Sequence, residues 1–472
     1  MLLYFAFFVF FGTYILIASE KIHKTAAALL GAMLMLLVVL PGPGHDSAAA
    51  LDKLAGLFSS GEVTQVEQPA MTAALGDAKS YSKLDVFSRY SNFDVIFTLA
   101  GMMILVNILS GTGLFQYIAI KCAKISKGSP VRLLTLLVLA TAILSAFLDN
   151  VTTVLLVAPV TLVVAAQMRV PVLPFLMAET LASNIGGTAT LIGDPPNLII
   201  GSIANLDFMA FLVNLSPFIV GLLFLYCIVL SVYYSKRMHV NAEERARIME
   251  LDARSAITDM VNLRRGGIVM SLTIIGFLLH GAVHLQPCVV AMAGATAALL
   301  VCKVDIDHAL EKIEWSTLFF FMGLFVLVSG AEKAGVMDCF GHILAFTYSW
   351  HALVTILAVM WLSAIAAAVM NNVSFTAAMA AIMAVFLQNA PQFSGNPALQ
   401  ELMWWGLALA VCLGGNGTIV GAAANLVVAG IAEKAGVKTT FTTFLRYGLP
   451  VTVGSMIFAS LYIGIRYYVT FG

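Results

Sequence analysis

The chain has 472 residues, of which 60% are hydrophobic and 11% charged, and its mean hydropathy is +0.96. A soluble domain has about 45–50% apolar and about 25% charged residues, so this composition excludes a soluble protein and predicts a polytopic membrane protein embedded in lipid. The 25 basic residues balance the 25 acidic ones, which argues against a nucleic-acid partner, and the six cysteines form no CxxC pair of the kind that binds zinc. We therefore expect an all-α protein without metal or cofactor.

Apolar segments long enough to cross a bilayer predict the helices. Two apolar blocks, 131–168 and 352–390, are too long for one span and carry polar residues at their middle, so each is expected to form two short helices that meet at a polar tip, as a re-entrant hairpin. Residues 42–92 form a polar loop, and residues 235–265 a charged linker between two halves. Ten spans are predicted near 2–19, 25–40, 93–112, 173–205, 210–234, 266–282, 289–303, 315–332, 402–430 and 447–468.

The distribution of Lys and Arg predicts the orientation, because these residues gather on the cytoplasmic side. One side receives most of the 25 basic residues, including the cluster from Lys236 to Arg265. Both termini are then expected outside a bacterial inner membrane. Full double crossings of the two blocks would give the same sides, so charge leaves re-entrance open. The outer side receives Lys53, Lys79, Lys83, Arg89, Lys333 and Arg466.

The sequence repeats itself in consistent order. Residues 93–115 match 315–337 at an offset of 222, and the tip 149–152 matches 371–374 at the same offset. Residues 186–197 match 414–425 at an offset of 228, and Gly31-Ala32 matches Gly294-Ala295. Two repeats, 1–234 and 266–472, each have five crossings and one hairpin. Because five is odd, the second repeat is expected to be inverted, which is the architecture of secondary transporters.

The two tips and the two breaks at 193–197 and 414–425 should form the site. Non-helical backbone inside lipid must be buried or face water, and Pro195-Pro196 cannot continue a helix. Intramembrane carboxylates indicate function, so Asp149 and Asp194 are predicted to carry the coupling proton or cation. Both belong to the first repeat, since their matches are Asn371 and Ala422. The predicted substrate-binding residues are Asn150, Thr152, Thr153, Thr190, Asn197, Asn371, Asn372, Ser374, Asn416, Thr418 and Asn425.

Structural alternatives exist for several of these residues. Asp149 and Asp194 can act as helix caps, and the asparagines can tie broken backbone together. Glu179 is either a third protonatable group or a polar residue near the cytoplasmic end of its helix. His280 and His284 lie one helical turn apart near the outer end of a span, which favours an interfacial pair over a metal site.

At these motifs the chain resembles the ion transporter superfamily, above all the branch that holds the arsenite permease ArsB, the sodium/proton antiporter NhaD and the pink-eyed dilution (P) protein. The segments Phe147–Thr153 and Asn184–Asn197 carry the resemblance, which spans nearly the whole chain apart from 42–92. It implies ten spans, two re-entrant hairpins, a scaffold and a moving part with an elevator-like cycle, and often a homodimer.

The predicted function is secondary active ion transport, and no enzyme activity is expected. Export of arsenite or antimonite against inward protons is the first prediction. A sodium/proton antiporter of the NhaD type and an anion permease of the P-protein type are the alternatives. The tips differ from the Ser-Asn-Thr tips of the dicarboxylate branch and contain no Arg, which disfavours a di- or tricarboxylate substrate. A passive channel and an aspartyl protease using Asp149 and Asp194 rank lower, and the protease lacks its Gly-x-Gly-Asp signature.

Overall fold

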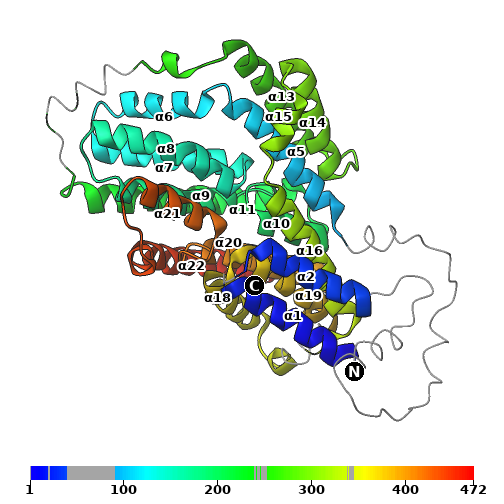
Figure 1. Cartoon of the computed structure of the whole chain (residues 1–472). Helices are drawn as coiled ribbons and strands as arrows, with labels where there is room; N and C mark the ends of the chain where they lie inside the picture. The colour runs from blue at the N-terminus through cyan, green and yellow to red at the C-terminus, as the bar shows by residue number, and fades with distance from the viewer. Residues whose placement is uncertain are drawn as a thin grey trace, which may run out of the picture. The chain divides into compact units, whose positions relative to one another are not determined.

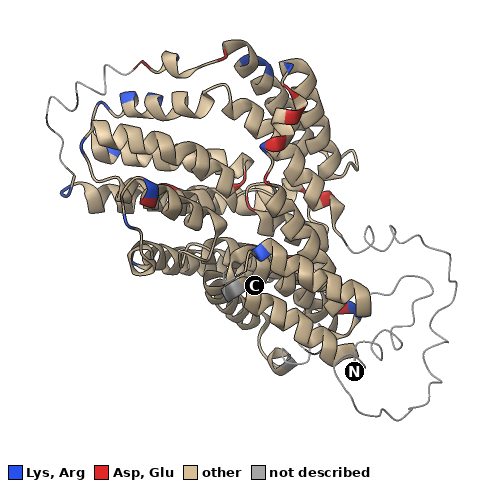
Figure 2. Ribbon diagram, viewed as in Figure 1, with Lys and Arg blue, Asp and Glu red and all other residues tan. Residues whose placement is uncertain are grey.

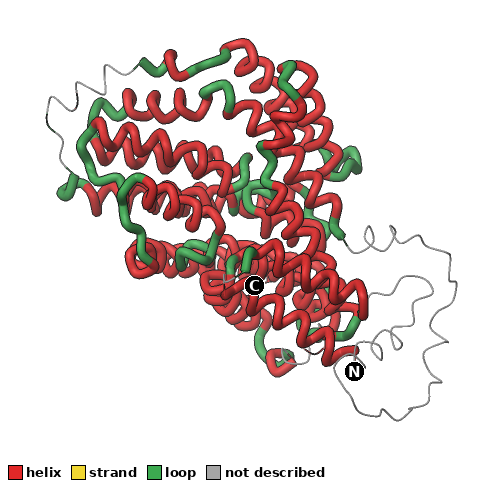
Figure 3. Tube along the Cα trace, in the orientation of Figure 1, coloured by secondary structure: helices red, strands yellow, loops and turns green. Residues whose placement is uncertain are grey.

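A computed structural model describes residues 2–19, 22–39, 91–238, 241, 245, 252–336, 339 and 345–471. These residues form helices joined by turns and loops, with no strand in the part described (Figure 3). The helices are α1 (Leu2–Ser19), α2 (Lys24–Val38), α5 (Phe93–Ser110), α6 (Leu114–Ile125), α7 (Pro130–Phe147), α8 (Asn150–Gln167), α9 (Leu173–Gly187), α10 (Pro195–Ala204), α11 (Phe208–Tyr234), α13 (Met260–Leu279), α14 (Pro287–Cys302), α15 (Ile306–Glu311), α16 (Trp315–Lys333), α18 (Ala352–Met370), α19 (Asn372–Asn389), α20 (Pro397–Gly414), α21 (Ala423–Lys434) and α22 (Phe441–Phe471). Short 3₁₀ turns lie at Arg254–Ala256 and Ala345–Thr347.

Ten of the described helices are long and apolar enough to cross a membrane, which confirms an all-helical integral membrane protein. Six of the ten lie in predicted spans, and these are α5, α11, α13, α16, α20 and α22. The other four are the hairpin helices α7, α8, α18 and α19, which have 18 or 19 residues each and fill the predicted blocks 131–168 and 352–390. Conversely, α1, α2 and α14 are shorter than 18 residues over their apolar part. Whether the hairpins are re-entrant stays a prediction.

Two predicted spans are interrupted. The segment 173–205 consists of α9 and α10 with a break at 188–194, and 402–430 consists of α20 and α21 with a break at 415–422. Helix α6 was not predicted, because its twelve residues include Lys121 and Lys124 and are too polar for a span. The expected loop 42–92 falls outside the described residues except at its last two positions.

The chain divides into two compact units, and each combines residues from both repeats. The first comprises Met1–Ile96 and Trp315–Ile343, and the second comprises Phe97–Glu314 and Leu344–Gly472 (Figure 1). In the first unit α2 packs between α1 and α16. A methyl group added at Gly323 on α16 would lie 2.8 Å from the Ala28 backbone on α2, so glycine permits this close approach.

The second unit contains the repeat-related packing. Helix α14 packs against α13, as α2 packs against α1. A methyl group added at Gly101 on α5 would lie 2.7 Å from the Ala291 backbone on α14. Gly101 matches Gly323 at the offset of 222, and Ala291 matches Ala28 at the offset of 263. The same helix-to-helix contact is therefore built twice, each time between helices of different repeats.

The rest of the second unit contains both hairpins and both breaks. Helix α7 packs along α9, and α18 packs along α20 in the same way. The second helix of each hairpin contacts a helix of the other repeat, since α8 contacts α21 and α19 contacts α10. This exchange brings the tip of each hairpin next to the broken helix of the other repeat, where the predicted site residues lie.

Candidate functional site

The two hairpin tips are closed by helix caps. Asp149 precedes α8, and its carboxylate accepts hydrogen bonds from the Thr152 backbone N–H at 2.9 Å and from the Thr152 hydroxyl. Asn371 precedes α19, adopts a φ of 73° in the left-handed region, and accepts a hydrogen bond from the Val373 N–H at 3.2 Å. Asp149 therefore acts as a helix cap, and Asn371 caps the second tip in the same way. Such a cap uses side-chain oxygen, so either Asp or Asn serves.

Threonine and asparagine side chains stabilise the two breaks with matching hydrogen bonds. The Thr190 hydroxyl donates to the Ala146 carbonyl, and the Thr418 hydroxyl donates to the Ala368 carbonyl. The Asn197 amide donates to the Thr190 carbonyl at 2.9 Å, and the Asn425 amide donates to the Thr418 carbonyl at 2.8 Å. These residues tie non-helical backbone that water does not reach, which lipid-buried irregular chain requires.

Asp194 lies fully buried between the two repeats. The Asn150 amide donates to its Oδ1 at 3.3 Å, and the Asn372 amide donates to its Oδ2 at 3.3 Å. Asn150 comes from the first hairpin tip and Asn372 from the second. The Asp194 side chain makes no cap hydrogen bond to α10, so the capping alternative does not hold there.

Asn184 extends this arrangement to the second break. It accepts a hydrogen bond from the Asn150 amide at 3.0 Å, and its own amide donates to Asn416 Oδ1 at 2.8 Å and Asn425 Oδ1 at 3.0 Å. Its match at the offset of 228 is Cys412, whose thiol donates to Asn197 Oδ1 at 3.3 Å. The resulting set of hydrogen-bonded side chains, here named the polar network, comprises Asn150, Asn184, Asp194, Asn197, Asn372, Cys412, Asn416 and Asn425.

Six of the predicted site residues thus lie in the polar network, and all its members are buried. Thr190 and Thr418 lie at its edge in the breaks, while Asp149, Thr152 and Asn371 bond locally at the tips. Thr153 and Ser374 are buried in the first turn of α8 and α19. Sequence reasoning missed Asn184 and Cys412 as site residues. Their matched positions two residues before each Gly-Gly pair were the available signal.

Four helix N-termini converge on the polar network, because α8, α10, α19 and α21 all begin at or within three residues of its members. Free backbone N–H groups and the positive end of the helix dipole favour negative charge at such a place. The network contains one carboxyl group, Asp194, and no Lys, Arg or His. It can therefore hold a cation beside Asp194 or accept an oxygen-rich solute through amide and backbone N–H donors.

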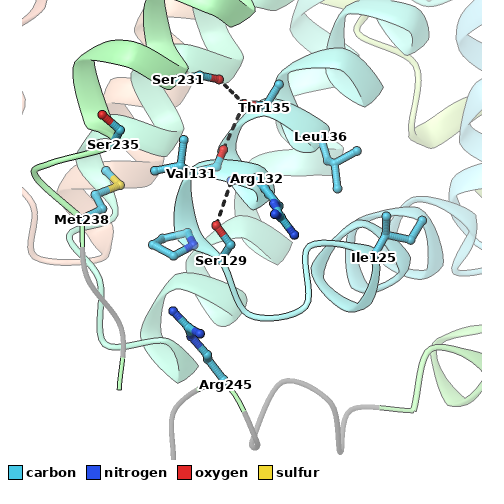
Figure 4. Close-up of a pocket in the computed structure, with 11 residues that line it drawn as sticks. Ile125, Ser129, Val131, Arg132, Thr135, Leu136, Ser231, Ser235, Met238 and Arg245 are labelled. Carbon is cyan, nitrogen blue, oxygen red and sulfur yellow. Dashed lines mark hydrogen bonds between the residues drawn. The ribbon is translucent and has the colours of Figure 1, made fainter. Parts of the chain in front are cut away.

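Two other features of the second unit do not belong to the polar network. The His280 ring binds the Phe208 N–H at 3.1 Å and lies 2.9 Å from the Leu285 carbonyl, which is a structural link between helix ends. A pocket of about 790 Å³ lies beside the first turn of α7 and the end of α11, where Arg132 and Arg245 flank apolar side chains (Figure 4). Both arginines belong to the predicted cytoplasmic set, and Figure 2 shows many of the coloured charged residues at helix ends and in loops.

Comparison with known proteins gives the family. Residues 14–410 match the CitMHS family, described as citrate transporter. A 46 kDa membrane protein of Mycobacterium leprae is 37% identical over 98% of both chains, and an uncharacterized transporter of Mycobacterium tuberculosis is 38% identical over the same shares. The P protein of Sus scrofa is 31% identical over 96% of this chain and 58% of its own length. Among solved structures, the YdaH transporter of Alcanivorax borkumensis shares the fold, with a TM-score of 0.55 and 14% identity over 96% of this chain and 99% of its own. The chain is therefore a membrane transporter of the CitMHS family within the ion transporter superfamily, related to the P proteins.

Proposed function

We propose that the chain is a secondary active transporter in which Asp194 binds the coupling cation, a proton or Na⁺. The observation that carries this proposal is the burial of Asp194 between amides from the two hairpin tips. A carboxylate removed from water is costly unless charge or hydrogen bonds compensate, so binding and release of a cation change its environment strongly.

The difference between the repeats supports a coupling role for Asp194. Its match is Ala422, which begins α21 as Asp194 begins α10, and both adopt extended backbone angles. The break therefore forms with or without a carboxyl group. The fold does not require Asp194, and a charge at this buried position is energetically unfavourable. A role in transport therefore explains Asp194 best.

The transported solute that fits the network best is a small oxyacid or oxyanion. Amide N–H groups and the N-termini of α19 and α21, which carry no acidic cap, suit oxygen acceptors. We propose arsenite or antimonite as the first solutes to test. Citrate is the second candidate, because the family match favours it although the network lacks the Arg that often recognises carboxylates. Sodium/proton exchange at Asp194 alone remains the alternative.

Flux measurements on the purified full chain in liposomes test the proposal. Arsenite, antimonite, citrate and Na⁺ are offered in turn under an imposed pH or Na⁺ gradient, and entry of the solute and of protons is followed. We expect saturable flux of one solute that Asp194→Asn abolishes. Asp252→Asn, which removes an exposed carboxyl group, serves as the matched control and should keep wild-type flux. Full coupled flux in Asp194→Asn would overturn the assignment.

A further inference from the structure

Glu179 on α9 is a second fully buried carboxyl group, outside the polar network. It is 2% exposed, and its Oε1 accepts a hydrogen bond from the Thr161 hydroxyl at 2.7 Å. Its Oε2 has no hydrogen-bond partner among the described residues. A carboxylate stabilised by one neutral donor is strongly disfavoured in a dry interior, whereas a protonated carboxyl group is tolerated. These surroundings therefore favour the protonated form of Glu179.

The surroundings of Glu179 offer weak acids and no buried base in the part of the chain that the structure describes. Helices α7, α8, α11, α20, α21 and α22 pack against α9. Their buried titratable groups are thiols and phenols, and Cys122 on α6, which is also buried, interacts electrostatically with the carboxyl group. The thiols and phenols are Cys227, Cys412, Tyr226 and Tyr234. The carboxyl groups and bases near these helices are not among the buried residues, and they lie at hairpin tips or toward helix ends. They are Arg132, Asp149, Glu401, Glu433, Lys434, Arg446 and Arg466.

The second repeat shows that the fold does not need this polar pair. At the offsets of 222 and 228, Thr161 matches Met383 and Glu179 matches Leu407. Both matches are 0% exposed and apolar, and they occupy the same places on α19 and α20. An apolar pair therefore fills this position well. The Thr161–Glu179 pair should therefore make the fold less stable than an apolar pair would. No structural requirement of the first repeat explains the polar pair.

Polar groups lie along the first repeat between Glu179 and Asp194. Ser183 lies one helical turn after Glu179 on α9, so the two side chains share a face. The Ser183 hydroxyl donates to Ser145 Oγ at 3.0 Å and lies 3.2 Å from the Asn150 carbonyl, and Asn150 binds Asp194. In the second repeat the serine positions are the apolar Val411 and Ala367. These polar residues thus occur in the first repeat and are not matched in the second.

We propose that Glu179 is a second proton-binding site of the transport cycle, which exchanges protons with Asp194 along the Ser183–Asn150 side of α9. The proposal rests on the proposed function and makes the coupling ion a proton. In each cycle a proton adds to the Glu179 carboxylate and later leaves the resulting acid, so only an O–H bond forms and breaks. The fold holds the neutral form, and the cycle exposes the group to water for release.

Infrared spectroscopy of the purified full chain tests proton binding without reference to any solute. The C=O stretch of a protonated carboxyl group should fade as the pH is raised in the wild type and in Asp194→Asn. Adding Glu179→Gln, which keeps the side-chain volume and the Thr161 hydrogen bond, to Asp194→Asn should remove the component that Asp194→Asn retains. The same fading signal in this double variant as in Asp194→Asn would overturn the proposal, even if the chain transports a solute through Asp194.

Proton flux into liposomes tests the role in coupling. Glu179→Gln should keep exchange of solute for solute at equal pH, with arsenite and citrate as probes, and should lose the flux driven by a pH gradient. The double variant Thr161→Met with Glu179→Leu rebuilds the apolar pair of the second repeat, so it should fold and show the same loss. A pH profile of gradient-driven flux equal to wild type in either variant would reject Glu179 as a proton carrier.

Discussion

At the scale of single residues, a comparison of matched positions in the two repeats helps to distinguish structural roles from functional ones. Thr190 and Thr418 make the same hydrogen bond, as do Asn197 and Asn425, so these residues hold broken backbone in both copies. Three of the pairs that differ have a member in the polar network, and they are Asn184 with Cys412, Thr188 with Asn416, and Asp194 with Ala422. Repetition thus indicates the structural role of Asn197 and Asn425, but it does not exclude a functional one, because Asn150 and Asn372 also match each other and both bind Asp194.

Asp149→Asn separates charge from capping at the first tip. Asn371 already caps α19 with an amide oxygen, so the substituted amide side chain should keep the cap on α8 and the folded protein. If the charge takes part in coupling, as the sequence predicts, gradient-driven flux should be lost while thermal unfolding stays near wild type. Asp149→Ala, which removes the cap, should cost about 0.5–2 kcal/mol of stability. Unchanged coupled flux in Asp149→Asn would leave Asp149 a cap only.

Asn372→Ala removes one of the two amides that bind Asp194. This amide stabilises the Asp194 carboxylate, and a hydrogen bond to a charged group is worth roughly 1.5–3 kcal/mol, so its loss should favour the protonated form and tighten proton binding by roughly 10–100-fold. The concentration dependence of flux measures this effect, with unfolding temperature recorded in parallel. Asn389→Ala, near the exposed end of the same helix, is the control and should leave affinity unchanged. Loss of folded protein in Asn372→Ala alone would indicate a structural role instead.

At the scale of helices, hydropathy and the positions of polar, Pro and Gly residues predicted most elements. Polar residues inside apolar blocks located both hairpin tips, and Pro195-Pro196 with the Gly-Gly pairs located both breaks. The outer bounds of the hairpin helices also agree with the apolar blocks 131–168 and 352–390 to within one residue, because hydropathy changes where each helix ends. Helix α6 was missed because it is amphipathic and short, and its apolar face is recognisable only once α7 and α8 cover it.

Gly186→Ala tests the packing that positions the first break. A methyl group there would overlap the Ala142 carbonyl on α7, as one at Gly414 would approach Ala364 on α18. Overpacking of this kind costs typically about 1–3 kcal/mol, so the unfolding temperature should fall. Gly430→Ala on α21 meets no atom within 4 Å and should be neutral or stabilising by about 0.4–1 kcal/mol. Equal stability of the two variants would contradict the close α7–α9 contact.

At the scale of the whole molecule, the sequence repeat predicted which elements correspond but not which elements pack. The first unit joins α16 of the second repeat to α1 and α2 of the first, and the second unit contains the reciprocal contact between Gly101 on α5 and Ala291 on α14. Such contacts join residues far apart in sequence, and an apolar helix in lipid shows no periodicity that marks its partner. Asp194 likewise depends on Asn372, a partner 178 positions away.

The predicted orientation places the residues between α13 and α14 outside and α15 inside the cell. The basic residues decide this, since Lys303 and Lys312 flank α15 whereas no Lys or Arg lies between Leu279 and Cys302. Gln286→Cys puts a thiol at an exposed position before α14, and Asp307→Cys puts one at an exposed position of α15. A membrane-impermeant maleimide added to intact bacteria should label Gln286→Cys above the level of the unmodified chain. Asp307→Cys should react only after the membrane is opened. The reverse pattern would invert the molecule in the membrane, and with it the direction in which Asp194 and Glu179 deliver protons.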